Sequence, residues 1–157
     1  MWGKETGGMP MLTVGELMTR ELVTLEEDDA LIQVDDLLKR HHIRHVPVVQ
    51  GRRLVGMVSH RDLIRALARQ PAGKAAQPLG VRDVMTRDVE TVAPDASARQ
   101  AIEKLLDRRF GCLPVVDGQG ELVGLVTESD FLRLALELLK ERDVSPQCFE
   151  QVPASPH

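Results

Sequence analysis

Two short stretches of the chain place a hydroxyl residue three positions before an aspartate, at Ser59–Asp62 and at Thr127–Asp130. Each stretch follows an apolar run of strand type, so the hydroxyl residue is expected at the start of a helix. Free amides at a helix N-terminus can hold a phosphate, and a carboxylate one turn later can accept both hydrogens of a ribose diol. The same spacing is typical of a capping box, which is purely structural. The residues alone leave both interpretations open.

The two stretches recur because the whole chain repeats itself. Residues 14–47 align with 81–114 at a constant offset of 67, and residues 54–67 align with 122–135 at an offset of 68. The offset changes between Gly51 and Gly56, in a stretch that reads as a turn, where an extra residue costs little. Such a long period predicts a duplicated unit whose two copies bury each other's apolar faces, so a site on one copy should recur on the other.

Each copy reads as strand, helix, strand, strand, helix, so we expect an α/β (α+β) fold of two β-α-β-β-α repeats. In the first copy we expect a strand at 21–25, a helix capped by Asp28 or Asp29 and ending near His41 or His42, strands at 46–49 and 54–58 joined by a turn at Arg52 and Arg53, and a helix after Ser59. In the second copy we expect a strand at 89–92, a helix from Asp95, strands at 113–116 and 122–126, and a helix after Thr127 that could extend through 132–141. The domain organisation is a tail at 1–13, repeat 1 at 14–68, a linker at 69–80, repeat 2 at 81–136, and a helix extension with a tail at 137–157.

The composition excludes several classes of protein. The 157 residues are 43% hydrophobic but include one Trp, no Tyr and three Phe, which favours an aliphatic core. A net charge of −4 argues against a dedicated nucleic-acid binder. The chain contains no secretory signal pattern and no stretch of about 18 apolar residues, so we expect a cytoplasmic protein without a membrane partner. Cys112 and Cys148 are too few and too far apart for a zinc motif or a disulfide framework.

No catalytic constellation emerges from the titratable residues, so we do not expect an enzyme. Cys112 has no evident activating partner and is interpreted as a buried thiol. His41, His42 and His45 form a run that could ligate a transition metal, but it lies where a helix should give way to a strand. A solvated helix end or a phosphate contact is the competing interpretation, and we assign no metal site.

An ordered set of short motifs in both copies resembles the cystathionine β-synthase (CBS) domain family. The set comprises a Met-Thr pair, a strand with Pro-Val-Val, and a Leu-Val-Gly strand that runs into the hydroxyl and aspartate. It lies at 17–19, 46–49 and 54–63 in the first copy, and at 84–86, 113–116 and 122–131 in the second. The resemblance covers about residues 14–68 and 81–136. It implies two repeats packed through their sheets as a pseudo-two-fold pair, called a Bateman module, with two clefts for adenosine-containing ligands.

The resemblance also implies site residues. Asp62 and Asp130 match the ribose-binding aspartate of the family, and Ser59 and Thr127 match its phosphate-side hydroxyl. The opposite repeat is expected to complete each cleft, mostly through backbone groups. The Asp130 cleft would use Thr19, Val23, Arg44, His45 and Val46, and the Asp62 cleft would use Thr86, Glu90, Gly111, Cys112 and Leu113.

The two clefts should differ in charge. Arg44 and His45 offer cationic groups to the Asp130 cleft, where Glu128 and Ser129 follow Thr127, whereas the segment of Gly111 and Cys112 offers none to the Asp62 cleft. His60 and Arg61 follow Ser59 and could reach a phosphate in the Asp62 cleft, so each cleft has one basic source. We therefore expect a ligand with at least one phosphate, such as AMP, ADP or ATP. S-adenosylmethionine or NAD is also possible, and no catalytic cofactor is expected.

We expect a regulatory module that binds such a nucleotide and signals to an unidentified effector protein by conformational or dimer rearrangement. The resemblance implies a homodimer formed through exposed helices. One alternative is a structural or dimerisation module with vestigial clefts. Another, which we favour less, is a nucleic-acid-associated regulator that uses Arg61, Arg65 and Arg69; these residues recur at helical spacing, and a solvated charged face is the preferred interpretation of them.

Overall fold

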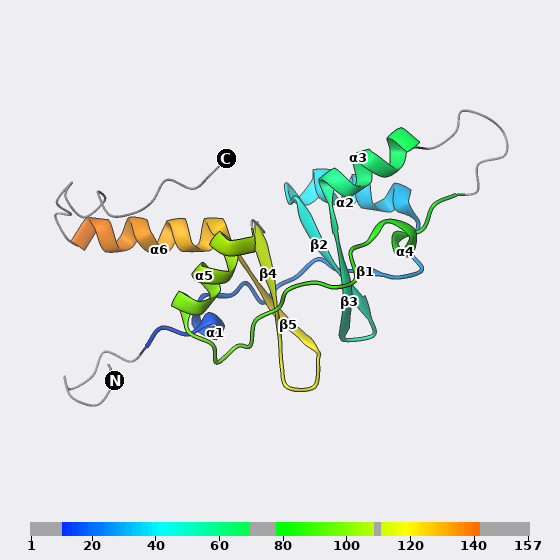
Figure 1. The fold of residues 1–157 in the computed structure, drawn as a ribbon. Helices are drawn as coiled ribbons and strands as arrows, with labels where there is room; N and C mark the ends of the chain where they lie inside the picture. The colour runs from blue at the N-terminus through cyan, green and yellow to red at the C-terminus, as the bar shows by residue number, and fades with distance from the viewer. Residues whose placement is uncertain (1–10, 70–77, 109–110, 142–157) are drawn as a thin grey trace.

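The computed structural model describes residues 11–69, 78–108 and 111–141, and Figure 1 shows their arrangement. In chain order the first half contains α1 (Val14–Leu17), β1 (Leu25–Glu26), α2 (Leu31–His41), β2 (His45–Gln50), β3 (Arg53–Ser59) and α3 (His60–Arg69). The second half contains α4 (Val81–Val84), α5 (Ala98–Arg108), β4 (Cys112–Val116), β5 (Leu122–Thr127) and α6 (Glu128–Glu141). The mixed α/β class and the duplicated β-β-α unit are confirmed.

Each half contains an antiparallel hairpin followed directly by a helix. In the first sheet, with strand order β1-β2-β3, Pro47 pairs with Met57, and in the second sheet Pro114 pairs with Leu125. Both hairpins shift register at the equivalent place, after Val48 and after Val115. Because the two hairpins are alike, the helices α3 and α6 leave their sheets in equivalent ways.

The two halves exchange their first helices. Val81 and Met85, from α4 and its end, lie in the core of the first half, whereas Val14 and Met18 lie in the core of the second half. Val14 and Val81 are fully buried in these positions. Each core therefore contains apolar side chains from both halves, and their burial stabilises the packing of one repeat on the other.

Glycines in β3 and β5 permit this exchange. A Cβ atom on Gly56 would lie 2.8 Å from the Thr86 carbonyl oxygen and 3.0 Å from Met85 Sδ. A Cβ atom on Gly124 would lie 2.8 Å from Met18 Cγ. At Gly56 the backbone of a segment from the other half leaves no room for a side chain, whereas at Gly124 an added Cβ atom would displace the Met18 side chain.

The starts of two helices differ from the sequence prediction. The expected cap at Asp28 or Asp29 is wrong, because α2 begins after Ala30 and the Asp29 carboxylate instead accepts from the Glu26 amide at 2.8 Å. The expected start of α5 at Asp95 is also wrong. Ser97 forms the cap there, and it exchanges hydrogen bonds of 3.1 Å with Gln100. In both cases the sequence has an Asp where a helix cap is expected. The same residue type also stabilises turns, and the sequence pattern does not distinguish the two roles.

The first strands are shorter than predicted. β1 covers only Leu25–Glu26, not 21–25, and around the predicted strand 89–92 only Val92 forms a bridge, with Val115. Residues 19–24 and 86–91 instead run from one sheet to the other. The turn of the first hairpin lies at Gly51 and Arg52, with Gly51 at φ 64°, and Arg53 already belongs to β3. The predicted extension of the last helix through 132–141 is confirmed by α6.

Candidate functional site

The start of α3 forms the first candidate site. Asp62 Oδ2 accepts hydrogen bonds from the Ser59 amide at 2.9 Å and from the Ser59 hydroxyl at 2.8 Å, and Ser59 Oγ accepts from the Asp62 amide at 3.1 Å. The capping box is therefore present. Within the described residues, Asp62 Oδ1 accepts no hydrogen bond. The structural role thus uses one carboxylate oxygen and leaves the other available to a ligand.

The start of α6 forms the second candidate site, and it differs. Asp130 Oδ2 accepts from the Thr127 amide at 2.8 Å and from its hydroxyl at 3.2 Å. The second oxygen, Oδ1, accepts from Arg133 at 3.0 Å, and the Asp130 side chain is only 8% exposed. Arg65 holds the equivalent position on α3, and the described contacts include no bond between Arg65 and Asp62. Sequence analysis missed Arg133, although its spacing of three residues from Asp130 on a helix is a recognisable signal.

Segments from the opposite half lie beside both sites. Thr86 exchanges two backbone hydrogen bonds of 2.9 Å with Met57, two residues before Ser59. Thr19 exchanges bonds of 2.9 and 3.0 Å with Leu125, two residues before Thr127. The structure therefore places Thr86 next to the strand that leads to Asp62, and Thr19 next to the strand that leads to Asp130.

The segments before the two Pro-Val-Val strands meet between the sites. The Arg44 carbonyl accepts from the His60 amide at 2.8 Å, and the Gly111 carbonyl accepts from the Glu128 amide at 3.1 Å. A Cβ atom on Gly111 would lie 3.3 Å from the His45 ring. The backbone thus places Arg44 beside the start of α3. No contact in the structure tests whether Arg44 and His45 contribute to the Asp130 cleft, so that expectation stays a prediction.

Burial is the largest cause of the pKa shifts of His45 and Cys112, the two titratable groups at this junction whose pKa departs from its ordinary value. Burial lowers the pKa of His45 below its ordinary value of 6.5, and Arg44 and Arg61 lower it further, while Asp62 and Glu128 act in the opposite direction. Burial, with a smaller contribution from Glu128, raises the pKa of the Cys112 thiol to about 12. The imidazole and the thiol are therefore both neutral at pH 7, and a protonated thiol of this kind is a poor nucleophile.

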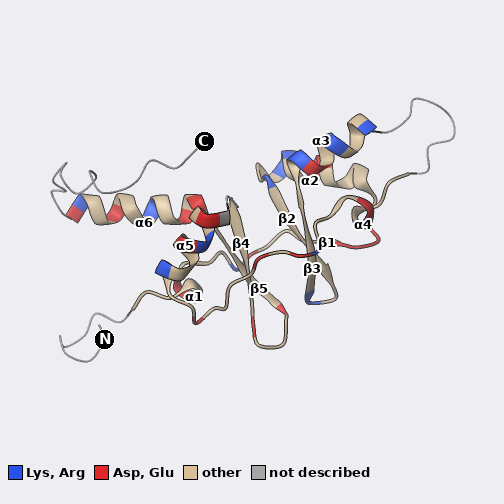
Figure 2. Ribbon diagram, viewed as in Figure 1, with Lys and Arg blue, Asp and Glu red and all other residues tan. Residues whose placement is uncertain are grey.

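The starts of α3 and α6 differ in the sign of the charged residues around them. Figure 2 shows basic residues along α3 and acidic residues at the start of α6. Arg44, His60 and Arg61 are exposed near Asp62, whereas Glu128 is exposed near Asp130. The start of α3 therefore suits an anion better than the start of α6 does.

The other predicted site residues contribute in different ways. Val46 and Leu113 are fully buried in the core, so only their backbone groups could contact a ligand. Thr19 and Thr86 are exposed, and Val23 is half-buried. The half-buried Glu90 forms an ion pair with Lys104 at 2.9 Å, which compensates its charge.

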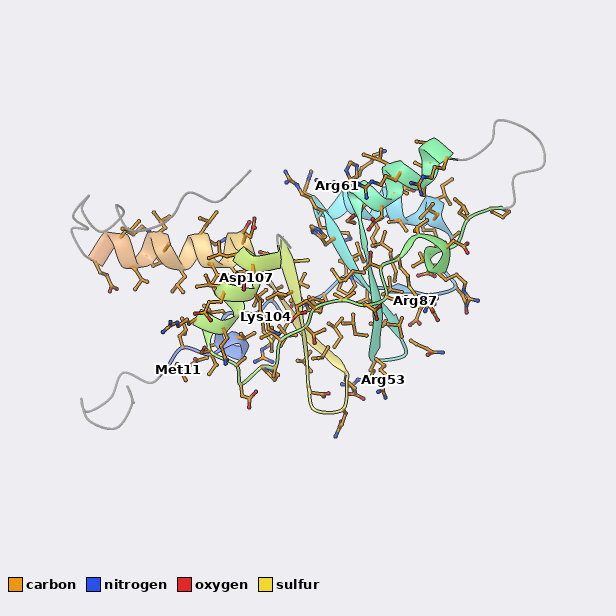
Figure 3. All side chains as sticks on the ribbon, viewed as in Figure 1. Met11, Arg53, Arg61, Arg87, Lys104 and Asp107 are labelled. Atoms are coloured by element: carbon orange, nitrogen blue, oxygen red, sulfur yellow. The ribbon has the colours of Figure 1, made fainter. Side chains whose placement is uncertain are left out.

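A groove of about 580 Å³ lies away from both helix starts, between α5, the segment at 91–96 and the end of β4. Figure 3 labels Lys104 and Asp107, two of the residues that line it. It includes none of the predicted site residues. In the part of the chain that the structure describes, no group of three or more His, Cys, Asp or Glu is arranged to hold a metal ion. The described helices also include none that is long and apolar enough to cross a membrane.

Comparison with known proteins places these features in a family. The CBS domain model matches residues 14–69 and 81–137. The AcuB protein from Vibrio cholerae has a similar structure, with 35% identity and a TM-score of 0.74 over 86% of this chain and 100% of that one. The CBS domain pair of MJ0100, in complex with 5-methylthioadenosine and S-adenosyl-L-methionine, is 26% identical, with a TM-score of 0.72 over 82% and 99% of the two chains. CBSX2 from Arabidopsis thaliana, in complex with AMP, is 30% identical, with a TM-score of 0.69 over 82% and 98%.

The curated relatives that the chain matches are longer than the chain. An inosine-5'-monophosphate dehydrogenase from Korarchaeum cryptofilum is 35% identical over 111 residues, which are 71% of this chain but 22% of the enzyme. MK0525 from Methanopyrus kandleri is 29% identical over 127 residues, which are 80% of this chain and 64% of that protein. The similarity to the dehydrogenase is confined to a part of that enzyme.

Proposed function

The chain belongs to the CBS domain family, and from this premise we propose that it is a regulatory module that senses an adenosine-containing nucleotide. The ligand binds at the start of α3, of α6, or of both. The bound state is passed to a partner protein. MJ0100 and CBSX2, which share the fold, bind S-adenosyl-L-methionine and AMP respectively, and this supports the ligand class.

One observation carries the proposal, namely the unused carboxylate oxygen of Asp62. It lies at a helix N-terminus, beside a hydroxyl and next to a segment from the opposite half. A ribose diol donates two hydrogen bonds to such a carboxylate, and the first-turn amides of α3 attract the phosphate. The capping box and the ligand contact are compatible because they use different oxygen atoms.

The charges favour different ligands at the two sites. We infer that a phosphate-bearing ligand such as AMP, ADP or ATP prefers the Asp62 site, where His60 and Arg61 are exposed in the first turn of α3. The Asp130 site carries Glu128 and has its second aspartate oxygen bound to Arg133. It therefore suits a ligand without an anionic phosphate, such as S-adenosylmethionine, which carries a cationic sulfonium group.

The output of the module is a change in packing. A ligand shifts an equilibrium between two arrangements only by its difference in affinity for them. Residues 19–24 and 86–91 run between the sheets, so a ligand bound beside them can bias how the two halves pack. A homodimer, an effector protein that recognises it, and a cytoplasmic location complete the proposal.

Isothermal titration calorimetry tests the proposal with the purified full chain against AMP, ADP, ATP, NAD and S-adenosylmethionine. We expect binding below millimolar concentration by at least one of them. Asp62→Ala should remove the phosphate-preferring site and Asp130→Ala the other. Binding by none of the five compounds, or an unchanged stoichiometry in the double variant, would contradict the proposal.

A matched control separates ligand contact from capping. Glu16 accepts from the Thr13 amide at 2.8 Å and from the Thr13 hydroxyl at 3.1 Å, which is the pattern that Asp62 forms with Ser59. Glu16→Ala therefore removes an equivalent cap, with a cost of about 1 kcal/mol in stability. It should leave nucleotide affinity unchanged, because Glu16 is neither of the two ribose-binding aspartates.

A second candidate function has one observation in its favour. Six large apolar side chains are exposed on α3 and α6, at Ile64, Leu67, Leu132, Leu136, Leu138 and Leu139. A module whose main task is dimerisation, with vestigial clefts, would show this surface and no nucleotide binding. The calorimetry distinguishes the two functions directly.

A further inference from the structure

The groove beside α5 has a lining of mixed chemistry that the nucleotide sites do not use. Its volume is about 580 Å³. The apolar part of the lining comprises Val92, Ala93, Ala96 and Val116. The carboxylates of the lining belong to Glu103, Asp107 and Asp117. Such a groove suits an apolar group that carries a positive charge close by.

Part of the negative charge in the groove has no basic partner. Two ion pairs use other charges of the lining, namely Lys104 with Glu90 and Glu103 with Arg99, each at 2.9 Å. Among the described residues, neither Asp107 nor Asp117 forms an ion pair. A cationic occupant therefore supplies a charge that the described lining lacks.

The first half of the chain does not repeat this lining. At the offset of 67, two longer acidic residues, Glu26 and Asp29, take the places of the two alanines. Asp107 corresponds to Arg40, so the charge at that position is reversed. The lining is therefore specific to the second half and is not a by-product of the duplicated fold.

The described chain begins beside the groove. Figure 1 shows α5 next to α1, which the chain reaches directly after its N-terminal segment at 1–10. The Leu12 carbonyl accepts from the amide of Ala98, the first residue of α5, at 2.8 Å, and Ala96 of the lining is two positions earlier. From Ala98 to Asp107 the helix rises about 14 Å. Ten extended residues span up to about 33 Å, so the N-terminal segment is long enough to reach the whole groove.

The composition of the two terminal segments decides which of them fits the groove. Residues 1–10 include Trp2 and Lys4, an aromatic ring and a positive charge two positions apart, and three glycines that permit a turn of the backbone. Residues 142–157 contain one Arg, one Asp and one Glu, so their formal charge is 1 − 2 = −1 with His157 neutral. The unpaired carboxylates of the groove repel the second segment and attract Lys4 of the first.

We propose that the groove beside α5 binds the N-terminal segment of the same chain, with the Trp2 ring against its apolar part and Lys4 at its carboxylates. The tether makes the contact intramolecular, at an effective concentration in roughly the millimolar range, so a small contact area is sufficient. Removal of the indole from water is the main favourable contribution. This site is separate from the nucleotide clefts, because the lining includes none of the predicted nucleotide contacts.

Tryptophan fluorescence tests the contact in the full chain. The sequence contains one Trp and no Tyr, so the emission reports on Trp2. Ala93→Arg fills the apolar part of the groove and adds a charge that repels Lys4. Acrylamide should quench the wild-type chain at least about threefold less strongly than this variant, because a bound indole is shielded from the quencher.

Ala68→Arg is the matched control, since it makes the same substitution at an exposed alanine of α3, outside the groove. Its quenching should equal that of the wild-type chain. Circular dichroism verifies that both variants are folded. Equal quenching of the wild-type chain and Ala93→Arg, or an equal increase in the control, would overturn the proposal.

A zero-length carbodiimide cross-link tests the contact without any substitution. This reagent joins a lysine to a carboxylate that it touches, so mass spectrometry should find an amide between Lys4 and Asp107 or Asp117. Mixing isotopically light and heavy chains distinguishes a link within one copy from a link between copies. A Lys4 link to other carboxylates only, a link between copies only, or no Lys4 link would overturn the proposal. Neither measurement uses a nucleotide, so failure of this proposal and failure of ligand sensing are observed separately.

Discussion

Removing the Arg133 guanidinium should strengthen ligand binding at the start of α6. Asp130 Oδ2 is already used by Thr127, so an incoming ribose must take Oδ1, which Arg133 occupies at 3.0 Å. The ligand must therefore displace the guanidinium or share the oxygen with it. Arg133→Ala removes this competitor while leaving the cap between Thr127 and Asp130 intact.

The structure sets the size of this effect. Arg133 is 74% exposed and pairs across three residues of one helix, so water screens the interaction. Pairs of this kind contribute about 0.2–1 kcal/mol, which corresponds to a gain in affinity of about 1.4-fold to fivefold. The gain should shrink at high salt, because screening weakens the pair in the wild-type chain.

Calorimetry with S-adenosylmethionine or AMP measures the effect in an Asp62→Ala background, where only the Asp130 site remains. Arg65→Ala in an Asp130→Ala background is the matched control, since Arg65 has the equivalent position and forms no described bond with Asp62. Its affinity should not rise. A fall in affinity on Arg133→Ala would refute the reasoning, because it would show that Arg133 contacts the ligand.

Two further predictions concern the junction of the halves. Gly56→Ala should lower the free energy of unfolding by about 1–3 kcal/mol in urea denaturation, because the added methyl group meets the backbone of the crossing segment at 2.8 Å. Gly118→Ala, with no atom within 4 Å of the new Cβ, should change it by less than about 0.5 kcal/mol, and an equal loss in both would contradict the packing argument. Because the pKa of His45 is lowered in the folded state, its contribution to stability is present above about pH 6.5 and is lost as the pH falls through the folded pKa. His45→Asn should therefore flatten the loss of stability between about pH 7 and pH 5, whereas replacing the exposed His41 by Asn should not.

Much of the fold could be predicted because the duplication doubles each local signal. The Pro-Val-Val strands, the hairpins and the helices after Ser59 and Thr127 all lie where the sequence predicts them. The capping box at Ser59 and the bond from the Thr127 amide to Asp130 were also predictable, since a hydroxyl residue and an aspartate three residues apart interact within one helical turn. The starts of α2 and α5 were harder to predict, because an Asp or Ser near a helix start can stabilise either a turn or a helix cap.

What the sequence determined by itself is the pair of equivalent helix starts, each with its hydroxyl and its aspartate. What only the tertiary structure decided is how the pair differs. Arg133 donates a hydrogen bond to Oδ1 of Asp130, whereas Oδ1 of Asp62 accepts none from the described residues. The helices that contain Val14 and Val81 each pack into the core of the other half. The physical reason is that a local pattern specifies which groups can interact within a turn. Competition for the remaining oxygen atom, and the burial of one half's apolar face by the other, depend on side-chain and segment positions that exist only once the chain has packed.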